Sequence, residues 1–414
     1  MAAISAQWTG KAGSDVLTLV SIGMLFFMAM VVFILARWGK LKLNGRYPVS
    51  TLTFVAILFT SGLDVGLIMF PLTEFPVYAD IQNNSEYAFA NPLAIEFGFW
   101  GFLVWAIYFV TCFYFCAIEP KVKFFEIPLV KWSNNIVIIG TCAFTAHLLF
   151  ANLSWYLPEI AAGDGFPWTY SLIVGATILF SVYSSTDIKF VKILSLSSGG
   201  LFFALIIGLG SVALMSDKVS ASDYLSTLPL LTTYFVHLDR FILPINDYHA
   251  FYLFWWFAWS IMIGQFTARF VGNMSTVKLF LCMLIWPSLS IGLWFSVLYV
   301  FHLKGLQTSG FINLAMVFVG IVFVINSLDS LIRLYSDNLD LTVARFGRQK
   351  YIGLHDFLMM LLTVLFSLQF IKIQWVGALV IGISLCCFVY ILLGKHQQPL
   401  PKTKALISLP NNKK

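Results

Sequence analysis

The chain has 414 residues, of which 59% are hydrophobic and only 11% are charged, and its formal net charge is +6. A soluble domain carries about a quarter charged residues, so this composition, with a mean hydropathy of +0.87, excludes an ordinary soluble protein. The apolar runs are about 20 residues long and do not alternate, which favours helices over a barrel. We therefore expect an all-α polytopic membrane protein, because lipid leaves no other way to satisfy the backbone.

In chain order, run length predicts about eleven transmembrane helices. They are 14–37, 50–72, 97–117, 134–156, 168–186, 192–215, 249–270, 277–301, 311–334, 355–372 and 374–394. Residues 222–244 hold a shorter apolar stretch flanked by Asp223, Asp239 and Arg240, which we interpret as an interfacial helix linking two halves. The whole of 1–414 is expected to be a single transmembrane domain, with 14–37 as a peripheral first helix and 395–414 as a cytoplasmic tail.

Positive charge sorts the connecting loops into two alternating sets. One set carries lysine and arginine, as at Arg37 to Arg46 and at Arg345 to Lys350, and the other carries acidic residues such as Glu74, Asp80 and Glu86. The positive-inside rule then predicts a cytoplasmic C-terminus, and eleven spans place the N-terminus outside. We expect the protein in the cell (inner) membrane. We expect no cleavable signal peptide, because no basic region precedes the first apolar run. The six cysteines lie within apolar runs, without the spacing of a metal site or a disulfide framework.

The second span contains its own helix breaker. Thr60 to Leu67 reads TSGLDVGL, with two glycines and one carboxylate in mid-membrane. Gly62 and Gly66 have the spacing of close helix packing, but an unwound stretch would also free backbone groups to coordinate a substrate or an ion. Asp64 marks a site or an ion path, or else it is a protonated aspartate that only holds helices together.

Aromatic residues cluster in two other spans. Trp100, Trp105 and Tyr108 lie in the third, and Phe251 to Ser260 contains Trp255, Trp256 and Trp259. An aromatic belt or plain core packing would explain any one of them. Together they suggest an aromatic site, because indole faces attract cations that have no hydrogen to donate, such as quaternary ammonium groups.

Two further polar features lie inside predicted spans. Asn326 and Ser327 open the sequence NSLDS, whose oxygens could ligate a hard monovalent cation or could bond between helices. His147 is either a proton carrier or a satisfied core residue. No nucleophile and base stand in a catalytic arrangement, so we expect no enzyme activity and no resident cofactor.

These segments resemble the betaine/choline/carnitine transporter family along nearly the whole chain. The segment from Phe251 to Ser260 is similar to the first part of the family signature FYWAWWxSWSPFxGxFxAR. The rest of the signature matches at Gly264, Phe266, Ala268 and Arg269. Trp100 with Trp105-Ala106-Ile107-Tyr108 is similar to W-x4-WAIY. The family motif SVxSGxD is similar to Ser181 to Ser184 with Asp187. The motif TSADS is similar to the NSLDS sequence, and the glutamate of the motif AEP is similar to Glu74.

The resemblance implies a LeuT-type fold of two inverted five-helix repeats, here 50–215 and 249–394, with a site at the membrane midplane. It implies an aromatic box of Trp100, Trp105, Tyr108 and Trp256. It also implies a cation site at Asn326 and Ser327 with backbone from Gly62 and Leu63. The partners that it implies are a small-molecule onium solute and the lipid bilayer, and no nucleic acid. Many members form homotrimers, which would add two further copies of the chain.

The chain also departs from the family. Gly62 to Gly66 replaces the sodium-coupled motif GMGIG, with Asp64 at its middle glycine, so the coupling ion stays open between Na+, H+ and none. A charged Asp64 would repel a substrate carboxylate by about 4 kcal/mol for unit charges 4 Å apart at an effective dielectric constant of 20. We therefore expect a choline-like cation carried by secondary active transport. Transport of another small zwitterion or amino acid, and a non-transporting sensor or partner protein, stay open as alternatives.

Overall fold

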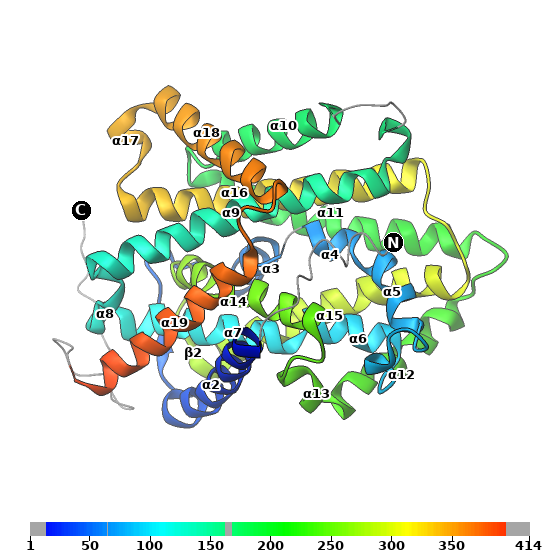
Figure 1. The fold of residues 1–414 in the computed structure, drawn as a ribbon, viewed down its shortest axis with the longest axis horizontal. Coiled ribbons are helices and arrows are strands. Elements are labelled where there is room, and N and C mark those ends of the chain that lie inside the picture. The colour runs from blue at the N-terminus through cyan, green and yellow to red at the C-terminus, as the bar shows by residue number, and fades with distance from the viewer. Residues whose placement is uncertain (1–13, 64, 162–167, 395–414) are drawn as a thin grey trace.

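The computed structural model describes residues 14–63, 65–161 and 168–394, and these are almost wholly helical (Figure 1). The first repeat's region contains α3 (Thr51–Ser61), α4 (Val65–Met69), α5 (Pro71–Ala79), α6 (Pro92–Trp100), α7 (Phe102–Phe113), the π-helical turn η2 (Tyr114–Ile118), α8 (Glu119–Val122), α9 (Pro128–Tyr156), α10 (Trp168–Ser184) and α11 (Lys189–Leu214). Before it comes α2 (Ser14–Trp38). After it come α12 (Ala221–Val236) and α13 (Leu238–Ile242), then α14 (Asp247–Ala268), α15 (Thr276–Leu303), α16 (Phe311–Leu339), α17 (Val343–Phe346), α18 (Arg348–Ser367) and α19 (Ile373–Leu392).

Short elements complete the chain. They are the 3-10 turns η1 (Ser85–Tyr87), η3 (Phe124–Glu126) and η4 (Pro158–Ala161), and two two-residue strands, β1 (Lys42–Leu43) and β2 (Met274–Ser275). The strands pair antiparallel, with Lys42 opposite Ser275 and Leu43 opposite Met274. Further backbone hydrogen bonds join residues 39–49 to residues 269–277 around this pair, so the two loops form one strap.

The helices confirm an all-α polytopic membrane protein. In the described ranges, eight helices are long and apolar enough to cross a membrane, and Thr51–Ser61 and Trp168–Ser184 are shorter apolar helices. α14 is not among the eight, since its tryptophan and tyrosine side chains lower its mean hydropathy, yet nearly all of its residues are buried. Each of the eleven predicted spans thus coincides with a helix or with a helix in pieces.

Some predicted boundaries were wrong. The third span begins at Pro92 rather than 97, because Asn91 caps the helix by accepting a hydrogen bond from the Ala94 backbone and Pro92 stands in its first turn. The tenth begins at Arg348 rather than 355. Hydropathy finds only the part of a helix that is apolar, and both helices extend through polar turns beyond it. The predicted linker helix is two helices, α12 and α13, separated at His237.

The helix contacts come in matched pairs. α3 packs on α11 as α14 packs on α19; α10 packs on α16 as α18 packs on α9; and α11 packs on α16 as α19 packs on α9. If each of the five spans from α3 to α11 is replaced by its counterpart among the five from α14 to α19, and the reverse, the same pairs of spans are again in contact. Two repeats related by a pseudo-two-fold axis require this. Because each repeat crosses the membrane five times, the second enters from the opposite side, and the fold is a 5+5 inverted repeat.

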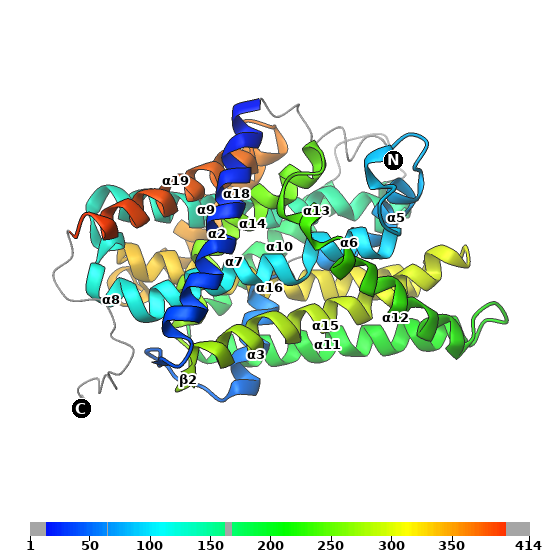
Figure 2. The same cartoon turned by 90° about the horizontal axis from the view of Figure 1, so that it is seen from below.

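The inner and outer positions of the helices follow from their burial. In the most apolar stretches of α9 and of the span Pro92–Val122, 72% of residues are buried, against 28% for α11, α18 and α19. α2 lies outside the repeats, against α7, α19 and α14 (Figure 2). The core of the molecule is therefore formed by α3–α4, α6–α7, α9, α14, α15 and α16.

Candidate functional site

The helix at the centre of the molecule is interrupted where the sequence predicts a break. α3 ends at Ser61 and α4 begins at Val65. An interruption frees carbonyl oxygens that lipid cannot satisfy, and neighbouring helices supply the donors. Ser327 of α16 donates to the Leu63 carbonyl at 2.7 Å, the Trp294 indole of α15 donates to the Leu67 carbonyl at 2.9 Å, and Tyr156 of α9 donates to the Met69 carbonyl at 2.6 Å.

The predicted ion-site residues come together at this break. The Ser327 hydroxyl also lies 3.5 Å from the Thr60 carbonyl, and Ser61 and Ser330 share a hydrogen bond of 3.0 Å. The neighbouring Asn326 side chain is fully buried, and its oxygen accepts a hydrogen bond from Ser195. Hydroxyl and carbonyl oxygens of α16 and of the broken helix therefore converge on one small polar region.

Asp64, predicted for both the substrate site and the coupling site, lies outside the described residues. Its neighbours Leu63 and Val65 are both fully buried. Gly62, another predicted residue, adopts φ −90° and ψ 0° and lies under the Trp105 ring, which a β-carbon would approach to 3.1 Å. Glycine at this position lets the backbone of the broken helix touch the aromatic residues directly.

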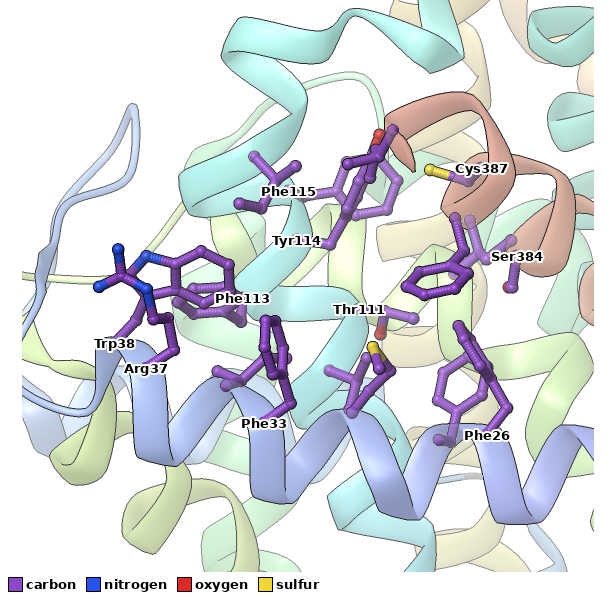
Figure 3. A pocket seen from close by; sticks show the side chains of 18 of the residues that line it. Phe26, Phe33, Arg37, Trp38, Thr111, Phe113, Tyr114, Phe115, Ser384 and Cys387 are labelled. Carbon is purple, nitrogen blue, oxygen red and sulfur yellow. The ribbon is translucent and has the colours of Figure 1, made fainter. Parts of the chain in front are cut away.

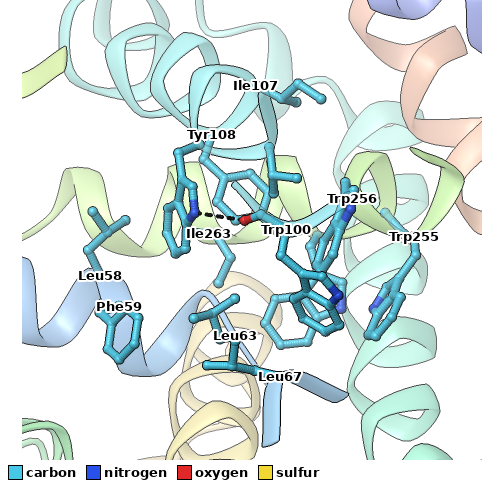
Figure 4. Close-up of a cluster of buried hydrophobic side chains, with 14 of the residues drawn as sticks. Leu58, Phe59, Leu63, Leu67, Trp100, Ile107, Tyr108, Trp255, Trp256 and Ile263 are labelled. Atoms are coloured by element: carbon cyan, nitrogen blue, oxygen red, sulfur yellow. Dashed lines mark hydrogen bonds between the residues drawn. The ribbon is translucent and has the colours of Figure 1, made fainter. Parts of the chain in front are cut away.

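Trp100 and Trp256 are buried together in the middle of the bundle (Figure 4). Their ring centroids lie 4.9 Å apart in an edge-to-face arrangement, and Trp255 stacks on Trp256 at 4.7 Å while contacting Trp100 at 5.5 Å. The Trp256 indole donates to the Phe99 carbonyl at 2.8 Å, next to the interruption of α6 and α7 at Gly101. We call Trp100, Trp255, Trp256 and Tyr252, whose ring also contacts all three, the tryptophan cluster.

Trp105 and Tyr108 form a second pair, with ring centroids 5.4 Å apart. The Trp105 indole donates to the Trp100 carbonyl at 3.2 Å, and this hydrogen bond, dashed in Figure 4, joins the pair to the tryptophan cluster. All four residues of the predicted box are at most 1% exposed, so none is splayed toward lipid. The structure thus brings the four together beside Gly62.

Trp259 does not join this group. It is buried on α14, but in the part of the chain that the structure describes no ring contact links it to the tryptophan cluster, and its indole nitrogen has no hydrogen-bond partner. His147 hydrogen-bonds to Ser367 of α18 at 2.9 Å. In the described ranges, no group of three or more histidine, cysteine, aspartate or glutamate side chains is placed to hold a metal ion.

Two arrangements escaped the sequence reasoning. Ser184 of α10 donates to Asp329 of α16 at 2.9 Å, and Arg333 bonds to Asp329 and to the carbonyls of Ser184 and Asp187, so two of the motifs meet. The other is Glu96, which lies fully buried next to Glu74, the glutamate matched to the AEP motif. Its only sequence signal was a carboxylate four residues before Trp100.

A separate groove of about 430 Å³ lies between α2, α7 with η2, and α19 (Figure 3). Its lining is almost entirely apolar, with Phe26, Phe33 and Trp38 from α2 and Arg37 at one end. It contains none of the predicted site residues. The groove therefore belongs to the rim formed by the peripheral helix and not to the candidate site.

The fold and this centre define a multi-pass helical membrane protein with a 5+5 inverted repeat and a buried aromatic site. A family model described as the betaine/carnitine/choline family transporter matches residues 4–119. This match and the similar proteins named below support membership of that family, which the motifs of the sequence also indicate.

Several curated relatives are similar over about two thirds of the chain. A glycine betaine/proline/choline transporter of Vibrio parahaemolyticus is 24% identical, covering 66% of this chain and 58% of its own length. The glycine betaine transporter OpuD of Bacillus subtilis is 26% identical (70% and 63%), and the high-affinity choline transport protein of Escherichia coli is 25% identical (71% and 49%). The alignments thus span between about half and two thirds of these relatives. A solved Na+-coupled sialic acid symporter superposes with a TM-score of 0.42 at 14% identity, covering 91% of this chain and 83% of its own.

Proposed function

We propose that this protein is a secondary active transporter of a quaternary ammonium solute. The observation that carries the proposal is the burial of Trp100, Trp105, Tyr108 and Trp256 side by side against the interrupted helix. Indole and phenol faces from α6, α7 and α14 can attract a cation that donates no hydrogen bonds, and the interruption supplies polar backbone beside them. The names of the similar transporters point to the same class of substrate.

The aromatic contacts suggest how such a solute is held. Trp255 covers one face of Trp256, and Trp100 meets Trp256 by its edge, so ring–ring contacts hold the tryptophan cluster together. The onium head would take a place between this cluster and the Trp105–Tyr108 pair, in contact with Gly62. Binding would exchange ring–ring contacts for cation–π contacts, which are stronger when they are shielded from water.

Within this class we propose choline rather than glycine betaine as the better substrate. The sequence places Asp64 next to Leu63, whose carbonyl faces Ser327. A carboxylate there repels the carboxylate of glycine betaine, whereas the hydroxyl of choline meets no such repulsion.

The coupling cation would act at the same interruption. Ser327, the Thr60 and Leu63 carbonyls, and Asn326 are the groups we propose for a Na+ site, and Asp64 is a candidate for proton uptake. Following the family resemblance, we also propose a homotrimer in the cell inner membrane, with the basic loops and the C-terminus in the cytoplasm.

The test is uptake of choline and of glycine betaine by proteoliposomes, with and without a sodium gradient and a pH gradient. Trp256→Ala should weaken choline binding at least about tenfold, because it removes roughly 1.4 kcal/mol or more of cation–π attraction. Trp256→Phe keeps an aromatic face and should lose less. Binding measured by isothermal titration on purified protein separates this effect from a loss of transport.

Trp286→Ala is the matched control, because Trp286 is 57% exposed on α15, where it faces away from the core. It should leave choline affinity unchanged. An unchanged affinity in Trp256→Ala with a wild-type melting temperature would contradict the onium site and favour a neutral or zwitterionic substrate. A preference for glycine betaine with Asp64 intact would contradict the choice of choline.

A further inference from the structure

Two glutamates are buried together next to the tryptophan cluster, and the proposed function does not use them. Glu74 lies on α5 and is 5% exposed; Glu96 lies on α6 and is fully buried. α5 and α6 pack on each other, and the Glu96 carboxyl lies near enough to that of Glu74 to interact with it electrostatically. Neither glutamate forms an ion pair among the described residues.

Glu74 is surrounded by hydroxyl donors. Tyr78 donates to it at 2.6 Å, Tyr252 donates to both of its oxygens at 2.8 and 3.0 Å, and Tyr248 donates to it as well. Charge-assisted hydrogen bonds of this kind stabilise the ionised form of a carboxyl group. Glu74 therefore has the hydrogen-bond donors that a carboxylate needs.

Glu96 has the opposite surroundings. Both of its oxygens are buried without a hydrogen-bond partner, although the Tyr78 hydroxyl and the Trp100 indole lie close by. The Trp100 indole nitrogen is itself fully buried and also has no hydrogen-bond partner. A donor from the aromatic site thus stands beside a carboxyl group that it does not bind.

Other titratable groups nearby supply no compensating positive charge. The elements around the pair contribute Tyr78 from α5, Glu86 and Tyr87 from η1, Tyr248, His249 and Tyr252 from α14, and Tyr299 and His302 from α15. His249 is buried, stacks on Phe99 and accepts a hydrogen bond from the Ile245 backbone, which fits a neutral ring. The nearby Arg240 is exposed and lies over Phe89.

Two ionised carboxylates cannot share such a site, because like charges repel strongly where water does not screen them. We propose that Glu96 is a proton-binding residue, that it and Glu74 hold one proton between them, and that this proton is the ion coupled to onium transport. The coupling part rests on the proposed function, and of the two candidates for proton uptake it selects this pair over Asp64.

The link to the substrate site is Trp100. When Glu96 holds the proton, it is neutral and exerts little pull on the indole N–H. When it releases the proton, the new carboxylate attracts that N–H, which turns the Trp100 ring against Trp255 and Trp256. In a transport cycle the proton is taken up as H+ from one side of the membrane and released as H+ on the other, so no other reactant is needed.

The first experiment does not depend on transport. Infrared difference spectroscopy of the purified protein between acid and alkaline buffer should show carbonyl bands of protonated carboxyl groups, and Glu96→Gln should abolish one of them. Glu126→Gln, which changes an exposed glutamate, should leave the band intact. Glu74→Gln should shift the loss of the band to lower pH, because it removes the neighbouring negative charge.

The second experiment uses choline as the probe in proteoliposomes with the membrane potential clamped. In the wild type, one symported proton should raise choline accumulation by about tenfold for each pH unit of gradient. Glu96→Gln should remove this response, while choline counterflow continues at a rate that no longer changes with pH.

The outcomes separate the two proposals. If Glu96→Gln loses a carbonyl band and the wild type binds neither choline nor glycine betaine, the shared proton is supported and the proposed function is overturned. Choline transport with a pH response that survives in Glu96→Gln overturns the coupling role of Glu96 and keeps the proposed function. If the carboxyl band persists in Glu96→Gln, the proton site itself is wrong.

Discussion

Arg333 and Asp329 form a buried ion pair that fastens α16 to the end of α10. Their atoms lie 2.9 Å apart, with the two side chains 8% and 0% exposed, and Arg333 also donates to the carbonyl of Ser184, where α10 ends, and to that of Asp187 just beyond. Ser184 donates to Asp329 across 145 positions of the chain. This one guanidinium therefore pairs with one oxygen of a buried carboxylate and binds the carbonyls at a helix terminus at once.

Arg333→Ala should destabilise the protein by about 3–5 kcal/mol, because it leaves the Asp329 charge buried without its partner. Removing both partners, as in Arg333→Ala with Asp329→Ala, should cost less than the single change. Thermal unfolding in detergent measures both effects. The control is Arg345→Ala, which breaks an exposed pair with Asp340 and should change stability by no more than about 1 kcal/mol. Equal losses in Arg333→Ala and Arg345→Ala would contradict the role assigned to Arg333.

At the residue scale, the aromatic positions could be predicted because their chemistry is unusual for mid-membrane. Trp100, Trp105, Tyr108 and Trp256 are indeed buried together, while Trp259 is set apart, since helical spacing cannot say which face meets the site. Glu96 was missed because it lies in an apolar run, and its importance appears only through Glu74, which is brought to it by packing.

At the scale of the elements, the interruption of the second span followed from Gly62, Asp64 and Gly66, and the structure places it between Ser61 and Val65. A second interruption at Gly101 and the π-helical turn Tyr114–Ile118 were not expected. Nothing in the local sequence marks them strongly. They depend on partners far along the chain, such as the Trp256 indole at the Phe99 carbonyl.

The backbones of α14 and α19 approach each other closely in the core. A β-carbon on Gly377 would lie 2.2 Å from the Phe254 carbonyl oxygen, so only glycine allows this contact. Gly377→Ala should force the two helices apart and lower stability by about 1–3 kcal/mol. Gly382→Ala in the same helix meets nothing within 4 Å and should be neutral or slightly stabilising. Melting temperatures of the two variants in one detergent make the comparison, and equal values would refute the close contact.

For the whole molecule, the number and order of the spans could be predicted from hydropathy, whereas the pairing between repeats could not. Hydropathy reports each segment's own apolar length, while contacts such as α3 on α11 and α14 on α19 depend on which faces meet. The two sets of loops do lie at opposite ends, with α5 and α12 near one end and α8 and α17 near the other (Figure 1). Which end faces the cytoplasm stays a prediction.

That orientation can be tested with one new cysteine at each end, at exposed positions. Gln82→Cys should react with a membrane-impermeant maleimide in intact cells, and Glu126→Cys should react only after permeabilisation, because the positive-inside rule puts the basic loops in the cytoplasm. The unmodified chain is the background control for its native cysteines, including the exposed Cys386. The reverse pattern would invert the proposed topology.

The strap between residues 39–49 and 269–277 has a mechanical consequence. Backbone hydrogen bonds, such as those from Gly45 to Val271 and from Tyr47 to Arg269, connect the segment before α3 with the segment after α14. These two helices are the first of the two repeats. Moving those helix ends apart would break this series of backbone hydrogen bonds, whereas tilting the two helices together would keep all of them. A conformational change that opens this end of the protein should therefore move α3 and α14 together as one rigid body.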